Sequence, residues 1–270
     1  MPTAHVNGIN LSYEVAGTGQ PLVLIAGLGY SRWMWSKMIP GLAQEIQVIS
    51  FDNRGVGESD QPSGPYTAQM MANDTAGLIE ALGLEQAAVM GHSMGGFIAQ
   101  ALALSRPDLV SHLVLSATNY GGPHHIPVTH EAMAVLTDVT GDPLERFRRG
   151  LEVSCAPGFA EAHPEIIEEW LQYRVENPIL PAPYKAQMEV GLGLLSEEAS
   201  FEHKLKNISM PTLILFGEYD KVVPPGNAEL LARELPDHKI VILPNAGHFF
   251  PLETPQAANA AILDFLKSHT

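Results

Sequence analysis

The sequence predicts an α/β fold built around a mostly parallel sheet with helices on both faces. Short, continuous apolar runs alternate along the chain with segments whose apolar residues recur at helical spacing. Strands that are apolar throughout are typical of parallel strands covered by helices on both faces. The chain has 270 residues, of which 46% are hydrophobic, so one large domain can bury a sizeable core.

The first part of the chain predicts a hairpin followed by two buried strands. Asn7-Gly8 is a strong turn signal that joins two short alternating runs at the start of the sequence. The apolar runs at 21–27 and 46–52 predict the third and fourth strands, each buried on both faces. A Gly-rich segment, "NRGVGESDQPSG", follows the fourth strand and predicts a long loop.

The alternation continues as far as a sixth strand. Pro40 bends or ends a helix predicted over 31–44, and a helix predicted over 66–84 stops near Gly83. The next predicted elements are a strand at 87–91, a helix at 95–106 ended by Pro107, and a strand at 110–118.

The pattern changes after the sixth strand. Residues 120–209 contain no convincing strand, and several of their helical segments open with Thr, Asp or Pro. The buried-strand pattern then resumes in "PTLILFGEYD", and one more strand and a closing helix follow. We therefore expect a core domain made of 1–119 and 210–270, with 120–209 inserted as a helical cap. Such an insertion can cover the crevice in which ligands bind.

Composition excludes several classes of partner. The formal net charge of -15 argues against nucleic acid and anionic membrane surfaces, which bind clustered Lys and Arg. No apolar run approaches the roughly 20 residues that span a bilayer, and no secretory signal is apparent, so a cytoplasmic location is expected. Cys155, the single cysteine, is expected to be a buried or half-buried thiol. A homo-oligomer is left open.

A serine stands between glycines where a strand is predicted to turn into a helix. The residues Gly91-His92-Ser93-Met94-Gly95 fit the pattern G-x-S-x-G, with "AAVM" before them and "FIAQALAL" close behind. An abrupt strand-to-helix turn strains the serine backbone and needs small residues two positions away on either side. The turn exposes the hydroxyl and leaves the next N–H at a helix N-terminus, where an oxyanion can develop. Ser93 is therefore the candidate nucleophile.

With this turn, the chain resembles the α/β-hydrolase family over nearly its whole length. The resemblance implies an eight-stranded sheet, a cap after the sixth strand, and a nucleophile followed by an acid and then a histidine. "LILFGEYDKVVPP" resembles the segment of the acid, which puts Asp220 there, with Glu218 as a local rival. "VILPNAGHFFPLETP" resembles the loop of the histidine, which is His248. Ser93 would then attack a carbonyl carbon, His248 would transfer its proton, and Asp220 would orient the imidazole.

The same resemblance implies an oxyanion hole made of two backbone N–H groups. Met94, which follows the candidate nucleophile, supplies one of them. The other belongs to the loop after the third strand, "LIAGLGYSRW", where Leu28 is the expected donor. This sequence departs from the family there, because Ala26 stands where a histidine is usual. Asp52 and Arg54 are expected to brace the neighbouring Gly-rich loop rather than to act on substrate.

A few other residues are of types that can bind a metal or a substrate. His124, His125 and His130 lie close together, but no carboxylate or cysteine stands at a familiar ligand spacing, so no metal and no cofactor are expected. His92 is expected to pack or to hydrogen-bond away from Ser93. The candidate substrate-binding residues are Trp33, beside the loop of Leu28, and Met133, Met188 and Leu192 of the cap.

The expected reaction is hydrolysis of a small-molecule ester through an acyl-serine intermediate. A serine at the turn argues against relatives that use aspartate or cysteine there. The length and the short cap are similar to small bacterial hydrolases of the 3-oxoadipate enol-lactonase and carboxylesterase type. Apolar cap residues favour an uncharged acyl group, which ranks a carboxylesterase first and a lactonase, for enol-lactones or acyl-homoserine lactones, second. Perhydrolysis, C–C bond hydrolysis and a ligand receptor with slow turnover are the further alternatives.

Overall fold

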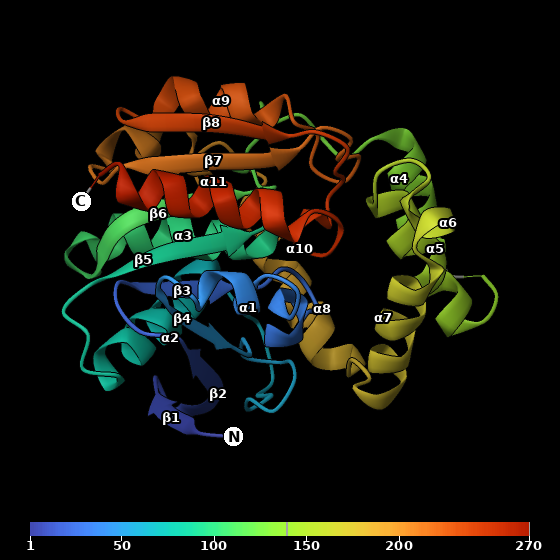
Figure 1. The fold of residues 1–270 in the computed structure, drawn as a ribbon, viewed down its shortest axis with the longest axis horizontal. Coiled ribbons are helices and arrows are strands. Elements are labelled where there is room, and N and C mark those ends of the chain that lie inside the picture. Colours follow the sequence, from blue (N-terminus) through green and yellow to red (C-terminus); the bar gives the residue numbers. More distant parts are fainter. Residues whose placement is uncertain (139, 270) are drawn as a thin grey trace.

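Eight strands form one sheet in the computed structural model, which describes residues 1–138 and 140–269. Their order is β1-β2-β4-β3-β5-β6-β7-β8. The pairs β1–β2 and β2–β4 are antiparallel, and the other pairs are parallel (Figure 1). The predicted α/β fold with a mostly parallel sheet is thereby confirmed. The strands are β1 (Thr3–Val6), β2 (Ile9–Ala16), β3 (Pro21–Ile25), β4 (Gln47–Phe51), β5 (Ala87–His92), β6 (Val110–Ser116), β7 (Thr212–Gly217) and β8 (His238–Leu243).

Helices cover both faces of this sheet, as predicted. Alternate residues of β3 show why: Val23 and Ile25 join the core cluster under α2, α3 and α9, whereas Leu22 and Leu24 join the cluster under α1 and α11. The helices of the core are α1 (Ile39–Leu42), α2 (Ala68–Ala81), α3 (Met94–Ser105), α9 (Asn227–Glu234), α10 (Phe250–Glu253) and α11 (Pro255–Lys267). Within the described residues, no helix is both long and apolar enough to cross a membrane.

The sequence signals at the first turn and at Pro40 have visible consequences. Asn7 and Gly8 both have positive φ, at 46° and 77°, which a two-residue hairpin turn of the observed twist requires. The helix expected over 31–44 is instead a 3₁₀ turn, η1 (Arg32–Trp35), followed by the short helix α1. Pro40 lies in the first turn of α1, where its missing N–H costs nothing, and it cannot continue a helix from the preceding residues.

The segment between β6 and β7 is helical. It holds α4 (His130–Leu136), α5 (Pro143–Ser154), α6 (Phe159–Ala162), α7 (Pro164–Glu176) and α8 (Pro181–Leu192), which we call the inserted helices, and the 3₁₀ turn η3 (Glu202–Asn207). Figure 1 shows α4 to α7 grouped beside the sheet, and α8 packs on α3. The described residues between β6 and β7 form no strand, which confirms the prediction of helices after the sixth strand.

The two ends of the insertion meet at the edge of the core. Gly122 N donates to Leu194 O at 2.6 Å, and Phe201 N donates to Tyr120 O at 2.8 Å. The domain boundaries at residues 119/120 and 209/210 stay predictions. Residues 139 and 270, which the predicted ranges include, lie outside the described residues.

A half-buried carboxylate ties the inserted segment to the C-terminal part of the core. Glu253, at the end of α10, accepts hydrogen bonds from Ala156 N at 2.6 Å and from Gly247 N at 3.0 and 3.1 Å. Burial raises the pKa of Glu253 from an ordinary value of 4.5 to about 7, although these two N–H groups act in the opposite direction. The folded protein therefore holds a proton on this group in a pH range where the unfolded chain has lost it.

We predict that Glu253→Gln changes the pH dependence of stability. Between about pH 5 and 7 the folded state binds more protons than the unfolded state at Glu253, so rising pH lowers the free energy of unfolding. The amide carries no charge and keeps one oxygen for both N–H groups. Urea unfolding at pH 5 and pH 8 should show the variant gaining stability relative to wild type as the pH rises. The same stability difference between variant and wild type at both pH values would contradict the burial argument. The matched control is Glu14→Gln, at an exposed position of β2.

Candidate active site

Ser93 lies at an abrupt turn between β5 and α3. Its backbone has φ 55° and ψ -118°, a strained conformation for a residue with a side chain. A Cβ on Gly91 would lie 2.1 Å from the carbonyl oxygen of Gly95, and one on Gly95 would lie 2.2 Å from that of Ile25. A Cβ on Gly96 would lie 2.3 Å from Thr118 Oγ1. The glycines around the serine are therefore required by close packing.

Asp220 and His248 meet because their strands are neighbours. β7 and β8 are parallel and pair from Thr212–His238 to Gly217–Leu243, so the loops that follow them leave the same edge of the sheet. Asp220 Oδ2 lies 2.8 Å from His248 Nδ1. Both residues are buried, at 3% and 5% exposure.

The surroundings of this pair fix its orientation. Asp220 Oδ1 accepts from Val222 N at 2.9 Å and from Val223 N at 2.8 Å, and His248 N donates to Ser154 O at 2.7 Å. With an ionised Asp220, Nδ1 of the imidazole carries the proton and Nε2 keeps its lone pair. Glu218, the rival acid, is exposed and accepts instead from Asn245 N at 3.2 Å.

A cavity of about 190 Å³ opens at Ser93. The backbone N–H groups of Leu28 and Met94, which both border it, have no hydrogen-bond partner among the described residues. Its lining is mostly apolar, and its polar members besides Ser93 are Thr118, Asn119 and Gln187. The lining residues are Leu28, Ser93, Met94, Phe97, Thr118, Asn119, Gln187, Met188, Gly191 and Val223.

His92 packs beside the candidate histidine. Its Nδ1 lies 2.8 Å from Ser116 Oγ, and its ring centroid is 4.9 Å from that of His248. Burial holds the pKa of His92 well below its usual value, so this imidazole stays neutral. A positive charge on His248 therefore meets no second charge from His92. The prediction that His92 packs and hydrogen-bonds away from Ser93 agrees with these contacts.

The loop 26–31 is held by side chains that the sequence patterns did not single out. Asn53 Nδ2 donates to Ala26 O at 3.1 Å, at the position where the family pattern has a histidine. Gln187 Oε1 accepts from Gly29 N at 2.9 Å, and Arg174 Nη2 donates to Gly29 O at 3.2 Å. These partners are 27 to 158 residues away in the chain, and no local spacing links them to the loop.

Asp52 and Arg54 make bracing contacts, as expected. Asp52 accepts from Arg32 N at 2.8 Å and from Glu58 N at 2.9 Å, and the Arg32 side chain also reaches it. Arg54 forms a buried two-point pair with Asp74 at 2.5 and 2.6 Å. Through these contacts, Asp52 and Asp74 hold the Gly-rich loop after β4 against the core.

The candidate substrate-binding residues are placed differently from one another. Met188 borders the cavity at Ser93. Trp33 instead stacks on Tyr173 of α7, with ring centroids 4.2 Å apart and planes 7° from parallel. Met133 and Leu192 are exposed and do not border that cavity. A binding role for all four residues stays a prediction.

The other reactive side chains are accounted for by burial or pairing. Cys155 is buried, which raises the pKa of its thiol well above the usual value, so it is not a reactive thiolate. His124 pairs with Glu202 at 2.9 Å. In residues 1–138 and 140–269, no group of three His, Cys, Asp or Glu side chains could hold a metal ion.

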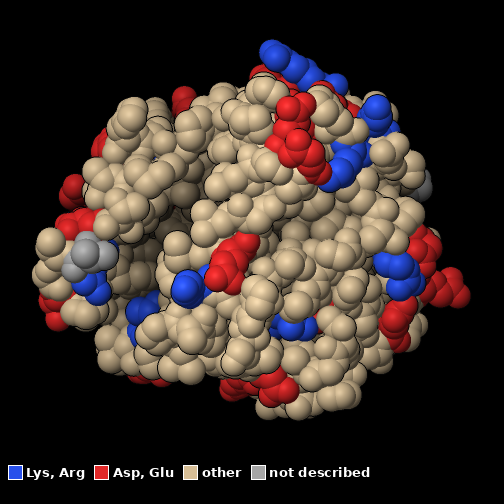
Figure 2. Space-filling view, turned by 180° about the vertical axis from the view of Figure 1, so that it is seen from behind, with Lys and Arg blue, Asp and Glu red and all other residues tan. Residues whose placement is uncertain are grey.

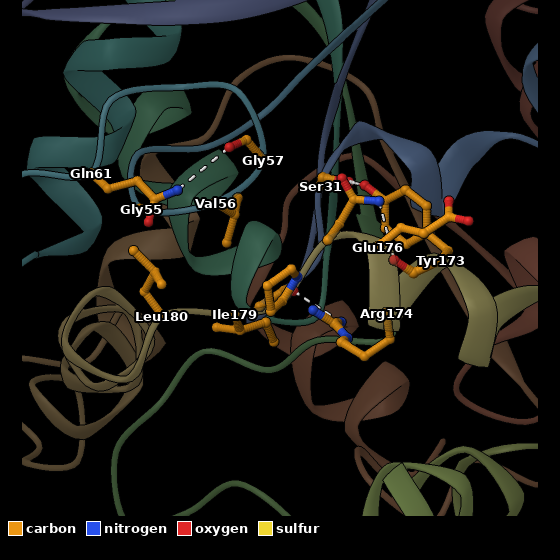
Figure 3. A pocket seen from close by; sticks show the side chains of 13 residues that line it. Ser31, Gly55, Val56, Gly57, Gln61, Tyr173, Arg174, Glu176, Ile179 and Leu180 are labelled. Carbon is orange, nitrogen blue, oxygen red and sulfur yellow. Dashed lines mark hydrogen bonds between the residues drawn. The ribbon is translucent and has the colours of Figure 1, made fainter. Parts of the chain in front are cut away.

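A second cavity of about 230 Å³ lies beside Gly29. Figure 3 shows it between the Gly-rich loop at Gly55–Gly57 and the end of α7, with Tyr173 and Arg174 along one side. Figure 2 shows the surface of the molecule deeply hollowed between the inserted helices and the core, with mostly uncharged walls. The inserted helices therefore wall the space around loop 26–31 and Ser93.

Comparisons with known proteins agree with this architecture. The α/β-hydrolase fold family matches residues 20–255. BpoC of Mycobacterium tuberculosis (strain ATCC 25618 / H37Rv), which carries the name of a non-heme bromoperoxidase, is 35% identical over 96% of this chain and 98% of its own.

Two solved structures are similar over nearly the whole chain. A thermophilic esterase from Thermogutta terrifontis has a TM-score of 0.79 and 32% identity, covering 97% of this chain and 94% of its own. The enol-lactonase from Burkholderia xenovorans LB400 has a TM-score of 0.82 and 26% identity, covering 98% of this chain and 100% of its own. The family match covers well over half of the sequence, so the chain belongs to the α/β-hydrolase fold family.

Proposed function

We propose that the protein is a serine hydrolase that cleaves carboxylic esters of small molecules. The observation that carries this proposal is the Asp220–His248 pair at 2.8 Å, on the same edge of the sheet as the strained turn of Ser93. A serine hydroxyl is a weak nucleophile unless a base takes its proton, and a base needs a partner that fixes its tautomer. The chain offers all three groups in the loops that leave one sheet edge.

The proposed reaction begins with attack of Ser93 Oγ on the ester carbonyl carbon. His248 Nε2 takes the hydroxyl proton, and Asp220 stabilises the resulting imidazolium through Nδ1. The oxyanion accepts hydrogen bonds from the free N–H groups of Leu28 and Met94. His248 then gives its proton to the departing alcohol, and water cleaves the acyl-Ser93 ester by the same steps in reverse.

The cavity supports an uncharged acyl group. Phe97, Met188 and Val223 border it with apolar side chains, and no Lys, Arg, Asp or Glu side chain is among its lining residues. Burying a charged acyl group there would leave that charge without a partner, at a cost of several kcal/mol. Esters with apolar acyl groups are therefore the first choice, in keeping with the similarity to an esterase.

A lactonase is the second candidate. Its support is the similarity to an enol-lactonase, since ring opening of a lactone uses the same attack, the same oxyanion and the same proton transfers. In a lactone the leaving alcohol stays attached to the acyl group, so the site must hold one compact ring rather than two separable parts.

The first prediction here is that hydrolysis depends on Ser93. Ser93→Ala should lower kcat by about 10⁴–10⁶-fold, because it removes the attacking atom. Initial rates on p-nitrophenyl esters from acetate to laurate, beside γ-lactones and acyl-homoserine lactones, measure this and rank esters against lactones. Ser63→Ala, at an exposed position of the Gly-rich loop, is the matched control.

The outcomes of this experiment separate the alternatives. Sustained turnover by wild type that is lost in Ser93→Ala supports a serine hydrolase, and the ester-to-lactone ratio chooses between its two forms. Retention of more than a tenth of the rate by Ser93→Ala would mean that another residue attacks. A burst of one equivalent of product per protein, with no further turnover, would favour a ligand receptor with slow turnover.

A second prediction concerns the tautomer of His248. In Asp220→Asn, the amide oxygen can still accept from Val222 N and Val223 N, which leaves the amide NH₂ group facing His248 Nδ1. The histidine must then carry its proton on Nε2, where it cannot act as a base, so kcat should fall by about 10²–10⁴-fold. Steady-state rates check the effect, with thermal unfolding as the fold control. A loss below tenfold would assign the acid role elsewhere.

A third prediction concerns acyl length. A Cβ at Gly191 of α8 would lie 3.7 Å from Phe97 Cε2, an ordinary contact, so Gly191→Ala should keep the wild-type preference. Gly191→Leu should fill part of the cavity and raise the butyrate-to-octanoate ratio of kcat/KM at least tenfold, because overpacking displaces the longer chain. The same ratio in all three proteins would place the acyl group outside this cavity.

A further inference from the structure

Gln187 joins an inserted helix to two loops of the core. It lies in α8, and its side chain is fully buried, at 0% exposure. Its Oε1 accepts from Gly29 N at 2.9 Å, and its Nε2 donates to Arg54 O at 2.8 Å. Both partners are backbone groups, so the contact depends on where the two loops run and not on which side chains they carry.

These two hydrogen bonds select an amide. Gly29 N requires an acceptor and Arg54 O requires a donor, and Gln187 supplies one of each across a single planar group. An apolar side chain of the same size would leave a buried N–H and a buried C=O without partners, at about 1–3 kcal/mol each. An ionised carboxylate would satisfy Gly29 N but would face the Arg54 carbonyl oxygen with a second acceptor.

The Gly29 N–H belongs to the residue directly after Leu28, whose N–H is the proposed oxyanion donor. It is part of the peptide bond that follows Leu28, a residue that borders the cavity at Ser93 and whose own N–H has no partner among the described residues. Asn53 holds the start of this loop through Ala26 O, and Arg174 of α7 holds Gly29 O. The Leu28 N–H therefore lies between contact points on the core and contact points on the inserted helices.

We propose that Gln187 is a positioning residue that sets the Leu28 N–H for the oxyanion and couples it to the inserted helices. The inference rests on the proposed hydrolase function. Gln187 also borders the cavity at Ser93, together with Met188 and Gly191 of the same helix. One helix thus forms a wall of the acyl cavity and holds the oxyanion hole, so a movement of α8 changes both together.

Replacing the amide tests this directly. Gln187→Met keeps the length of the side chain and removes both hydrogen bonds. We expect kcat on a p-nitrophenyl ester to fall by about 10–100-fold with KM changed less than threefold, because a displaced donor costs somewhat less than the roughly 10²–10³-fold loss of a deleted one. The matched control is Gln172→Met, at an exposed glutamine of α7 whose side chain donates to Glu176.

An acidic replacement gives a readout that packing alone would not move. In Gln187→Glu, the protonated acid can donate to Arg54 O and accept from Gly29 N, whereas the ionised form loses the first bond. Because burial at this position raises the pKa of a carboxyl above its ordinary value, the ratio of variant kcat to wild-type kcat should rise as the pH falls from 8 to 5. This variant keeps the test decisive if Gln187→Met does not fold.

A boronic acid reports on the oxyanion hole itself. It adds to a serine hydroxyl and places an oxygen where the oxyanion forms, so its inhibition constant should rise in Gln187→Met by the factor by which kcat/KM falls. A folded Gln187→Met with wild-type kcat, or a Gln187→Glu ratio that ignores pH, would overturn the inference. Wild-type protein without Ser93-dependent turnover would instead overturn the proposed function, and the inference with it.

Discussion

The strained turn at Ser93 is the constraint around which the rest of the site is arranged. A positive φ at a serine costs about 1–3 kcal/mol and persists only where the surroundings over-determine it. Here the surroundings are backbone: the carbonyl oxygen of Ile25, at the end of β3, lies only 2.2 Å from the position that a Cβ on Gly95 would take. Because loop 26–31 starts at that same point of β3, the serine turn and the loop of Leu28 are packed against each other. The turn therefore fixes the start of the loop.

Much of this arrangement was predictable, because it follows from local pattern and from the topology of a parallel sheet. The apolar runs predicted the strands, and Asn7-Gly8 predicted the hairpin. Apolar residues at helical spacing predicted the helices inserted after β6. Asp220 and His248 were singled out by the resemblance to the α/β-hydrolase family, and parallel pairing of β7 with β8 explains why they meet. The roles proposed for these side chains still depend on measured rates.

What the sequence could not reveal are contacts between single polar side chains and distant backbone. Gln187 and Gly29 are 158 residues apart, and a glutamine among apolar neighbours in a helix has no spacing that marks its partner. The raised pKa of Glu253 has the same origin, since it comes from burial in the folded chain, against which the hydrogen bonds from Ala156 N and Gly247 N act. The 3₁₀ turn at η1 was missed because periodicity predicts helix without distinguishing its hydrogen-bond pattern.

The placement of the second cavity adds a last step to this picture. The two cavities share loop 26–31 as a border: Leu28 borders the one at Ser93, and Gly29 borders the one beside Arg174. Gly29 is gripped through its N–H from α8 and through its carbonyl from α7, so both grips come from the inserted helices. In the proposed reaction, a substrate that enters between these helices and the core must do so without releasing them from Gly29, or the Leu28 N–H loses its support when the oxyanion forms. On that proposal the inserted helices of this chain contribute to the chemistry by holding backbone, in addition to shaping the space that the substrate occupies.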